Sequence, residues 1–173
     1  MGSRNVEKKL PLLVLAACVA GMASGQGMRI TSSAFGEGQA IPKRYTCDGE
    51  NVSPPLAWTG VPSGARAVAL VVEDPDAPRG KFTHWLVLDL PPEARSLPEG
   101  VKALPSGAVQ GVNDFGKAGY GGPCPPSGRH RYVFHLYALD SRLGLKEPVH
   151  PPVDALLRGH IAAEARLTGT YAR

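Results

Sequence analysis

The chain has 173 residues, including 21 glycines and 17 prolines, and carries a formal net charge of +4. This length suits one domain with a proper core and is too short for two comfortable ones. Half of the net charge lies in residues 1–27, and beyond them the two signs are interspersed. The composition therefore excludes the basic footprint of a nucleic-acid-binding protein, and we expect no nucleic acid as a partner.

Residues 1–27 have the pattern of an export signal. Arg4, Lys8 and Lys9 precede an apolar run over residues 10–20, and small residues follow through Gly25. The apolar run is too short to span a bilayer on its own. We expect a signal peptide over residues 1–27 and a single domain over residues 28–173. The protein is then exported to the periplasm or anchored by lipid in a bacterial envelope, with secretion as the alternative.

Cys18 leaves the processing of this signal open. The stretch Leu15-Ala16-Ala17-Cys18 resembles a bacterial lipoprotein box, in which Cys18 becomes the acylated first residue. Ordinary cleavage after Ala23-Ser24-Gly25 would instead release a soluble protein from about Gln26. Met28 is a third alternative, as the start of a cytoplasmic product. The lipid anchor is the only membrane attachment that we expect.

Short apolar runs separated by glycine and proline predict a mainly β domain. The runs at 67–72 and 84–90 are apolar on both faces, so these strands should be central and covered on both sides. Further strands are expected at 29–35, 56–59, 109–112, 132–139 and 165–171, with an extended piece at 41–45. One helix is expected after Pro151-Pro152, from the helical spacing of Val153, Leu156, Leu157, His160 and Ile161.

The three strongest strands carry polar side chains at one end. Asp74 and Asp76 follow the first strand, His84 opens the second, and His130 opens the third. In antiparallel neighbours, the end of one strand lies beside the start of the next. Asp74, Asp76 and His84 can therefore meet at one rim, and His130 joins them if its strand runs the same way as that of His84.

A stiff loop leads into the third strand. Residues 119–128 contain four glycines and three prolines, which can build neither a helix nor a paired strand. Free backbone N–H groups beside histidine and arginine suit a small anion. A metal site is disfavoured because no histidine spacing typical of metal ligands is present. Cys124 and His130 would form a nucleophile pair, but no third orienting residue is evident.

Cys47 and Cys124 remain as an even pair if Cys18 is lipidated or removed. In an oxidising compartment they would form a disulfide that ties the 46–49 loop to the 119–128 loop. The alternative is two free thiols lining a polar pocket.

Three ordered motifs resemble the phosphatidylethanolamine-binding protein family, most closely its bacterial and archaeal branch, often labelled Raf kinase inhibitor-like. They are Asp74-Pro75-Asp76-Ala77-Pro78, His84-Trp85, and the segment from Gly119 to Tyr132. The resemblance covers essentially residues 28–173. It implies two antiparallel sheets with a small pocket at one end, partly covered by a C-terminal helix. In the family this pocket binds phosphate-like anions, including phospholipid head groups. Carried over by motif position, the ligand-binding residues are Asp74, Asp76, Pro78, His84, Trp85, Gly122, Pro123, Pro126, His130 and Tyr132.

The sequence thus favours a non-enzymatic protein that binds a small anion or a phospholipid head group, without a metal or cofactor. Two alternatives stay open. One is an inhibitor of, or interaction module for, a protease or kinase, using the same rim. The other is a weak hydrolase in the same pocket that uses Asp74 and His84, or a metal.

Overall fold

The computed structural model describes residues 1–2 and 27–173 of the chain. The predicted signal peptide and the possible lipidation site at Cys18 lie outside the described residues. The elements, in chain order, are β1 Arg29–Thr31, the 3-10 turn η1 Lys43–Tyr45, β2 Leu56–Thr59, β3 Ala67–Asp74, β4 Phe82–Leu90, β5 Ser96–Leu97, β6 Val109–Gln110, β7 Arg129–Leu139, α1 Asp154–Leu157 and β8 Ile161–Ala172.

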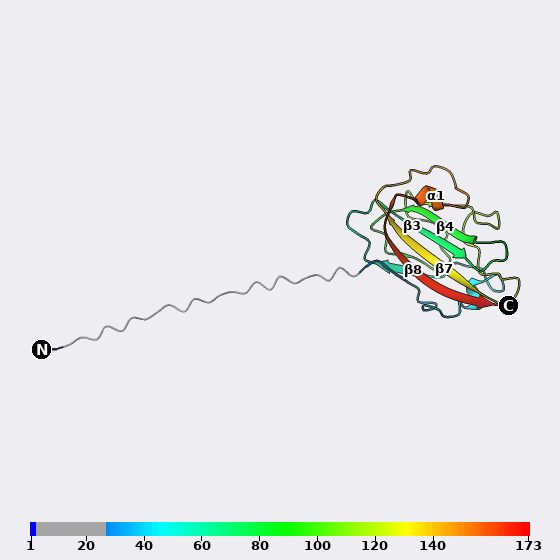
Figure 1. The fold of residues 1–173 in the computed structure, drawn as a ribbon, viewed down its shortest axis with the longest axis horizontal. Helices are drawn as coiled ribbons and strands as arrows, with labels where there is room; N and C mark the ends of the chain where they lie inside the picture. The colour runs from blue at the N-terminus through cyan, green and yellow to red at the C-terminus, as the bar shows by residue number, and fades with distance from the viewer. Residues whose placement is uncertain (3–26) are drawn as a thin grey trace.

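Two antiparallel sheets make up the fold (Figure 1). The larger sheet has the order β6-β4-β3-β7-β8, and the smaller one has the order β1-β2-β5. The predicted mainly β class with two antiparallel sheets is confirmed. The long strands β7 and β8 pair along nearly their whole length, from Arg129 opposite Ala172 to Leu139 opposite Ile161.

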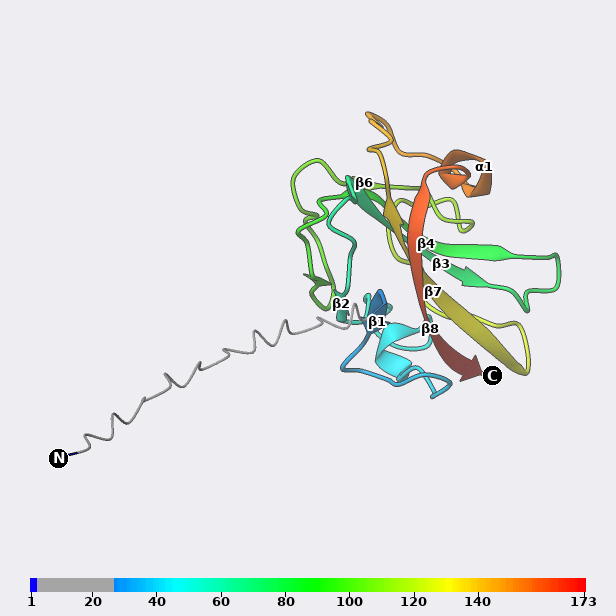
Figure 2. The same cartoon turned by 60° about the vertical axis from the view of Figure 1, so that its left-hand side comes forward.

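The strand β3 is central and buried at every position, as its unbroken apolar run predicts. Val68, Leu70 and Val72 face the core between the two sheets, where they join side chains such as Trp58 of the smaller sheet. The alternate residues, among them Val71, face the opposite side, which is covered by the segment that contains α1. Figure 2 shows α1 and the β1–β2 region on different sides of the large sheet.

Three expectations about the elements are corrected. The piece at 41–45 is not extended, because Tyr45 donates its N–H to the carbonyl of Pro42 and the chain turns there. The first strand ends at Thr31 rather than at residue 35. The expected helix over 153–161 is a single turn that ends at Leu157, because Gly159 has a φ of +84° and Ile161 already pairs with β7.

The short helix α1 stands apart from the pocket described below. None of the residues of α1 is in the cavity lining, and the carboxylate of Asp154 accepts hydrogen bonds from the lining residue Lys81. The expectation that the C-terminal helix partly covers the pocket is therefore wrong. In the described part of the chain, no helix is long and apolar enough to cross a membrane.

Candidate functional site

The polar ends of three strands meet at one edge of the large sheet. Both β4 and β7 flank β3 and run antiparallel to it, so they run parallel to each other. The starts of β4 and β7 therefore lie beside the end of β3. This arrangement brings His84 and His130 to the same edge as Asp74, as strand direction predicted.

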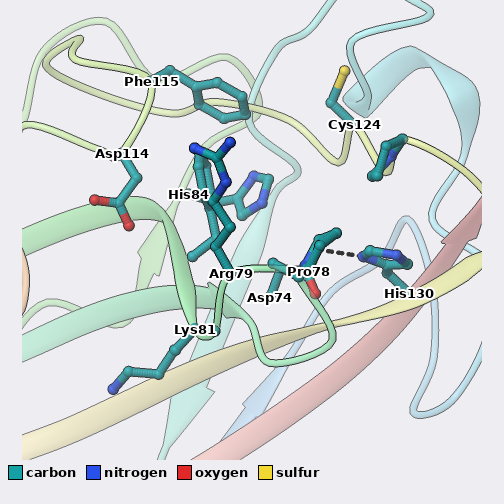
Figure 3. Close-up of a pocket in the computed structure, with 13 residues that line it drawn as sticks. Asp74, Pro78, Arg79, Lys81, His84, Asp114, Phe115, Cys124 and His130 are labelled. Carbon is teal, nitrogen blue, oxygen red and sulfur yellow. Dashed lines mark hydrogen bonds and ion pairs between the residues drawn. The ribbon is translucent and has the colours of Figure 1, made fainter.

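A cavity of about 530 Å³ opens at this edge (Figure 3). Five of the ten ligand-binding residues expected from the sequence line it: Asp74, Pro78, His84, Pro126 and His130. The lining also includes residues that sequence reasoning did not assign to ligand binding, chiefly Arg79, Lys81, Phe82, Asp114, Phe115 and Cys124.

Asp74 and His130 form a buried pair in the wall of the cavity. The Nδ1–H of His130 donates to Asp74 Oδ2 over 2.7 Å, and Asp74 Oδ1 accepts the backbone N–H of Asp76 over 2.8 Å. Because an ionised carboxylate only accepts hydrogen bonds, it holds the ring proton on Nδ1. The Nε2 atom of His130 is then the ring nitrogen left for a ligand.

His84 is aimed into the cavity by a β-bulge. Val72 pairs with Trp85 and Glu73 pairs with Thr83, so His84 is the extra residue on β4. Bulges commonly re-aim a side chain beside a functional site. The 119–128 loop holds His84 by two hydrogen bonds. The backbone carbonyl of His84 accepts the N–H of Gly121, and the Nδ1–H of its ring donates to the Gly121 carbonyl over 2.7 Å.

Burial lowers the pKa of His84 below its ordinary value of 6.5. The imidazole is therefore neutral at neutral pH, with its proton on Nδ1. Its Nε2 atom can accept a hydrogen bond in this state, and it can donate one when the ring is protonated.

Asp76, which the sequence predicted as a ligand-binding residue, lies outside the cavity lining. Its carboxylate accepts hydrogen bonds from the side chain of Arg131, at 2.6 and 2.9 Å, and from the Arg131 backbone N–H at 2.9 Å. The Arg131 side chain, and then its N–H, lower the pKa of Asp76 to about 2. Asp76 is an ion-pair partner that fixes the loop after β3.

Trp85 and Tyr132 were expected in the pocket but lie behind it. Both are fully buried in the core between the sheets. The ring of Tyr132 stands edge-on to His84, with the centroids 5.1 Å apart, and so backs the imidazole. Trp85 packs instead against Tyr120.

Gly122 and Pro123 also lie behind the lining, as part of the loop wall. A Cβ at Gly122 would lie 2.5 Å from Asn51 Oδ1 and from the Tyr45 carbonyl, so only glycine permits this approach. The Gly122 N–H donates to Asn51, and the Pro123 carbonyl accepts the N–H of Cys47. These contacts fasten the 119–128 loop to the loop that follows η1.

The same two loops are joined covalently in the structure. Cys47 is bonded to Cys124, with their Cα atoms 5.4 Å apart, inside the usual range for disulfides. Cys124 borders the cavity, and its sulfur is engaged in this bond rather than offered as a thiol.

Arg79 and Phe115 are the main site residues that the sequence interpretation missed. Arg79 lies exposed in the β3–β4 loop, and no ion pair joins it to another of the described residues. The sequence could have predicted its place at the site, because Arg79-Gly80-Lys81 links two strand ends that were already expected at the rim. Phe115 lies on a loop after β6, for which the sequence offers no comparable signal.

The cavity therefore combines two anchored imidazoles with an exposed guanidinium. The carboxylates of the lining already accept hydrogen bonds within the protein: Asp74 from His130, and Asp114 from the N–H of Thr83 over 2.6 Å. Within residues 27–173, no group of three or more His, Cys, Asp or Glu side chains is placed to hold a metal ion. This set of groups suits a small oxyanion.

Comparisons with known proteins agree with the family resemblance. A family model described as "Phosphatidylethanolamine-binding protein" matches residues 31–172. A "UPF0098 protein" from Methanothermobacter thermautotrophicus is 52% identical over 151 residues, which cover 84% of this chain and 99% of that protein. A "UPF0098 protein" from Aquifex aeolicus is 46% identical over 157 residues, covering 87% and 92% of the two chains.

Two solved structures share the fold with a TM-score of 0.78. One is a phosphatidylethanolamine-binding protein homologue from Chlamydia trachomatis, which is 44% identical; the match covers 85% of this chain and 98% of that one. The other is YbcL from E. coli, described as a member of the mammalian family, which is 34% identical; the match covers 86% and 99%.

Proposed function

The chain belongs to the phosphatidylethanolamine-binding protein family, and we propose that its pocket binds a small phosphate-like anion, such as a phospholipid head group, without catalysis.

One observation carries this proposal. His84 and His130 face one cavity, and each uses Nδ1 to bond a fixed oxygen, on Gly121 and on Asp74 respectively. Each ring therefore presents Nε2 in a set orientation. An imidazole held in this way binds an oxyanion at little ordering cost, because its rotamer is already fixed.

Charge supports the same ligand class. Arg79 adds a cation at the mouth that no carboxylate neutralises among the described residues, and guanidinium groups recognise phosphate oxygens well. Cys124, the nucleophile that the sequence raised as an alternative, is bonded to Cys47 in the structure. Binding is thus better supported than hydrolysis by a cysteine nucleophile.

Isothermal titration with inorganic phosphate, phosphoethanolamine and acetate tests the proposal. We expect phosphate and phosphoethanolamine to bind more tightly than acetate. Loss of one charge-assisted hydrogen bond is typically worth about 1.5–3 kcal/mol, so His84→Ala and His130→Ala should each weaken binding at least about tenfold. His150→Ala, which changes an exposed histidine outside the cavity lining, is the matched control.

Thermal melts of all three variants check that the fold is retained. Absence of binding to the unaltered protein, or unchanged affinity in folded His84→Ala and His130→Ala, contradicts the proposal.

We further propose that the binding domain is exported. The family match begins only at residue 31, so the charged and apolar segment before it is an addition to the family domain. A pocket stabilised by a disulfide is also suited to an oxidising compartment.

A further inference from the structure

Phe115 is an exposed aromatic side chain at the mouth of the pocket. It is 44% exposed, and few other large apolar side chains in the described part of the chain are so open to solvent. Its ring packs against Phe82, with the centroids 4.8 Å apart, and against His84 at 5.3 Å. The three rings form one aromatic wall of the cavity.

The loop that carries Phe115 is held in place by a buried asparagine. Asn113 Oδ1 accepts the N–H groups of Phe115 and Lys117, and Asn113 Nδ2 donates to the carbonyl of Gly119 over 2.8 Å. Asn113 is 3% exposed, so these bonds are shielded from water. Asn113 thus fixes the main chain at Phe115.

Gly121 fixes the same ring from behind. A Cβ at this position would lie 2.5 Å from Phe115 Cδ2, closer than such atoms approach, so glycine is required for the ring to lie where it does. The backbone of the loop and Gly121 thus hold an exposed aromatic ring in one place. Covering its remaining apolar surface with a ligand would be favourable, and little ordering cost would be paid because the ring is already fixed.

The two ends of the cavity differ in chemistry. His130 and Asp74 form the polar end, and Phe82 and Phe115 form the aromatic end. Figure 3 shows Phe115 on the side of the pocket away from His130, with the side chain of Arg79 extended toward the ring. The volume of about 530 Å³ lies in the range of sites for ligands of drug size, well above what a bare phosphate fills.

We propose that the pocket selects phosphate monoesters whose alcohol carries a planar ring, with the phosphate at His84 and His130 and the ring against Phe82 and Phe115. This inference rests on the proposed anion-binding function and names its ligand class. Ring pairs in offset or edge-on contact contribute beyond the area that they bury, which favours a planar ring over an alkyl chain.

Titration calorimetry with methyl phosphate, phenyl phosphate and n-hexyl phosphate tests the inference, because the three probes carry the same charged group. We expect phenyl phosphate to bind about tenfold more tightly than methyl phosphate, and more tightly than hexyl phosphate. In Phe115→Leu, which keeps an apolar side chain but removes the ring, phenyl phosphate should lose most of this gain. Because Phe115 also contacts His84, the readout is the ratio of the phenyl phosphate affinity to the methyl phosphate affinity, which cancels any general effect of the substitution on the anion site and should fall toward one in Phe115→Leu.

Ile161→Leu is the matched control, because Ile161 is equally exposed but lies at the opposite end of the β7–β8 pair. Equal affinities for methyl and phenyl phosphate, or an equal gain for hexyl phosphate, overturn the inference and leave the anion site standing. A phenyl gain that persists in Phe115→Leu also overturns it. If neither methyl phosphate nor inorganic phosphate binds, the proposed function itself fails.

Discussion

Arg79→Gln removes the positive charge at the mouth of the pocket while keeping a polar side chain of similar length. Two unit charges about 4 Å apart interact by about 1 kcal/mol in water and about 4 kcal/mol at a protein surface of lower effective dielectric constant. Arg79 is exposed, so the lower part of this range applies. A loss of about 1–2 kcal/mol corresponds to binding that is about 5- to 30-fold weaker.

Isothermal titration with phosphate measures this loss, and Arg66→Gln provides the matched control. Arg66 is also exposed, but it precedes β3 at the end away from the pocket, so the same change of charge should leave the affinity nearly unaltered. The difference between the two variants should shrink as salt is raised, because exposed charges are screened. Equal effects of the two substitutions would refute the assignment of Arg79 to the site.

Three further predictions concern the loops and the terminus. Replacing Cys47 and Cys124 by alanine should lower the free energy of unfolding by up to about 4.5 kcal/mol, the loop-entropy value for a bridge spanning 77 residues, and denaturant melts measure it. Asp76→Asn should destabilise the fold at pH 7 without changing phosphate affinity. Since the pKa of Asp76 is lowered from 3.8 to about 2, its contribution is present above pH 3.8 and disappears as the pH falls toward 2, so melts of protein and variant should converge there. Intact mass measurement of protein from its native host should show either a chain starting near Gln26 or an acylated Cys18; an unprocessed N-terminus would contradict export.

The rim of the sheet was predictable because strand direction decides which ends meet. Apolar runs placed the three central strands, and antiparallel pairing then brought Asp74, His84 and His130 together. None of this needed knowledge of side-chain packing. It followed from where the polar residues stand relative to the ends of the strands.

The directions of the side chains at the site were harder to predict from the sequence than the positions of the strand ends. The bulge that aims His84 into the cavity depends on pairing between β3 and β4, which leaves no local mark in the sequence. The motif that contains Asp76 does not reveal that its carboxylate pairs with Arg131 instead of lining the cavity. Trp85 follows His84 directly, and the sequence offers no means of telling which of the two faces the core.

The prediction of a longer C-terminal helix was wrong for a different physical reason. Its apolar spacing is real, but Gly159 ends the helix after one turn, and pairing of Ile161 with β7 satisfies the backbone instead. Long-range strand pairing here overrides a local pattern.

The central claim is that the imidazoles of His84 and His130 hold the anion, and nitrogen NMR of the labelled histidines tests it most directly. In the free protein, burial keeps the pKa of His84 below 6.5, so this ring is neutral at pH 7. Bound phosphate should raise that pKa and turn Nε2 of His84 into a proton donor, with the Nε2 signal of His130 shifting in the same titration. Affinity should accordingly rise as the pH falls from 7 toward the pKa of the free ring. Saturation with phosphate that leaves both Nε2 signals unchanged would contradict the account.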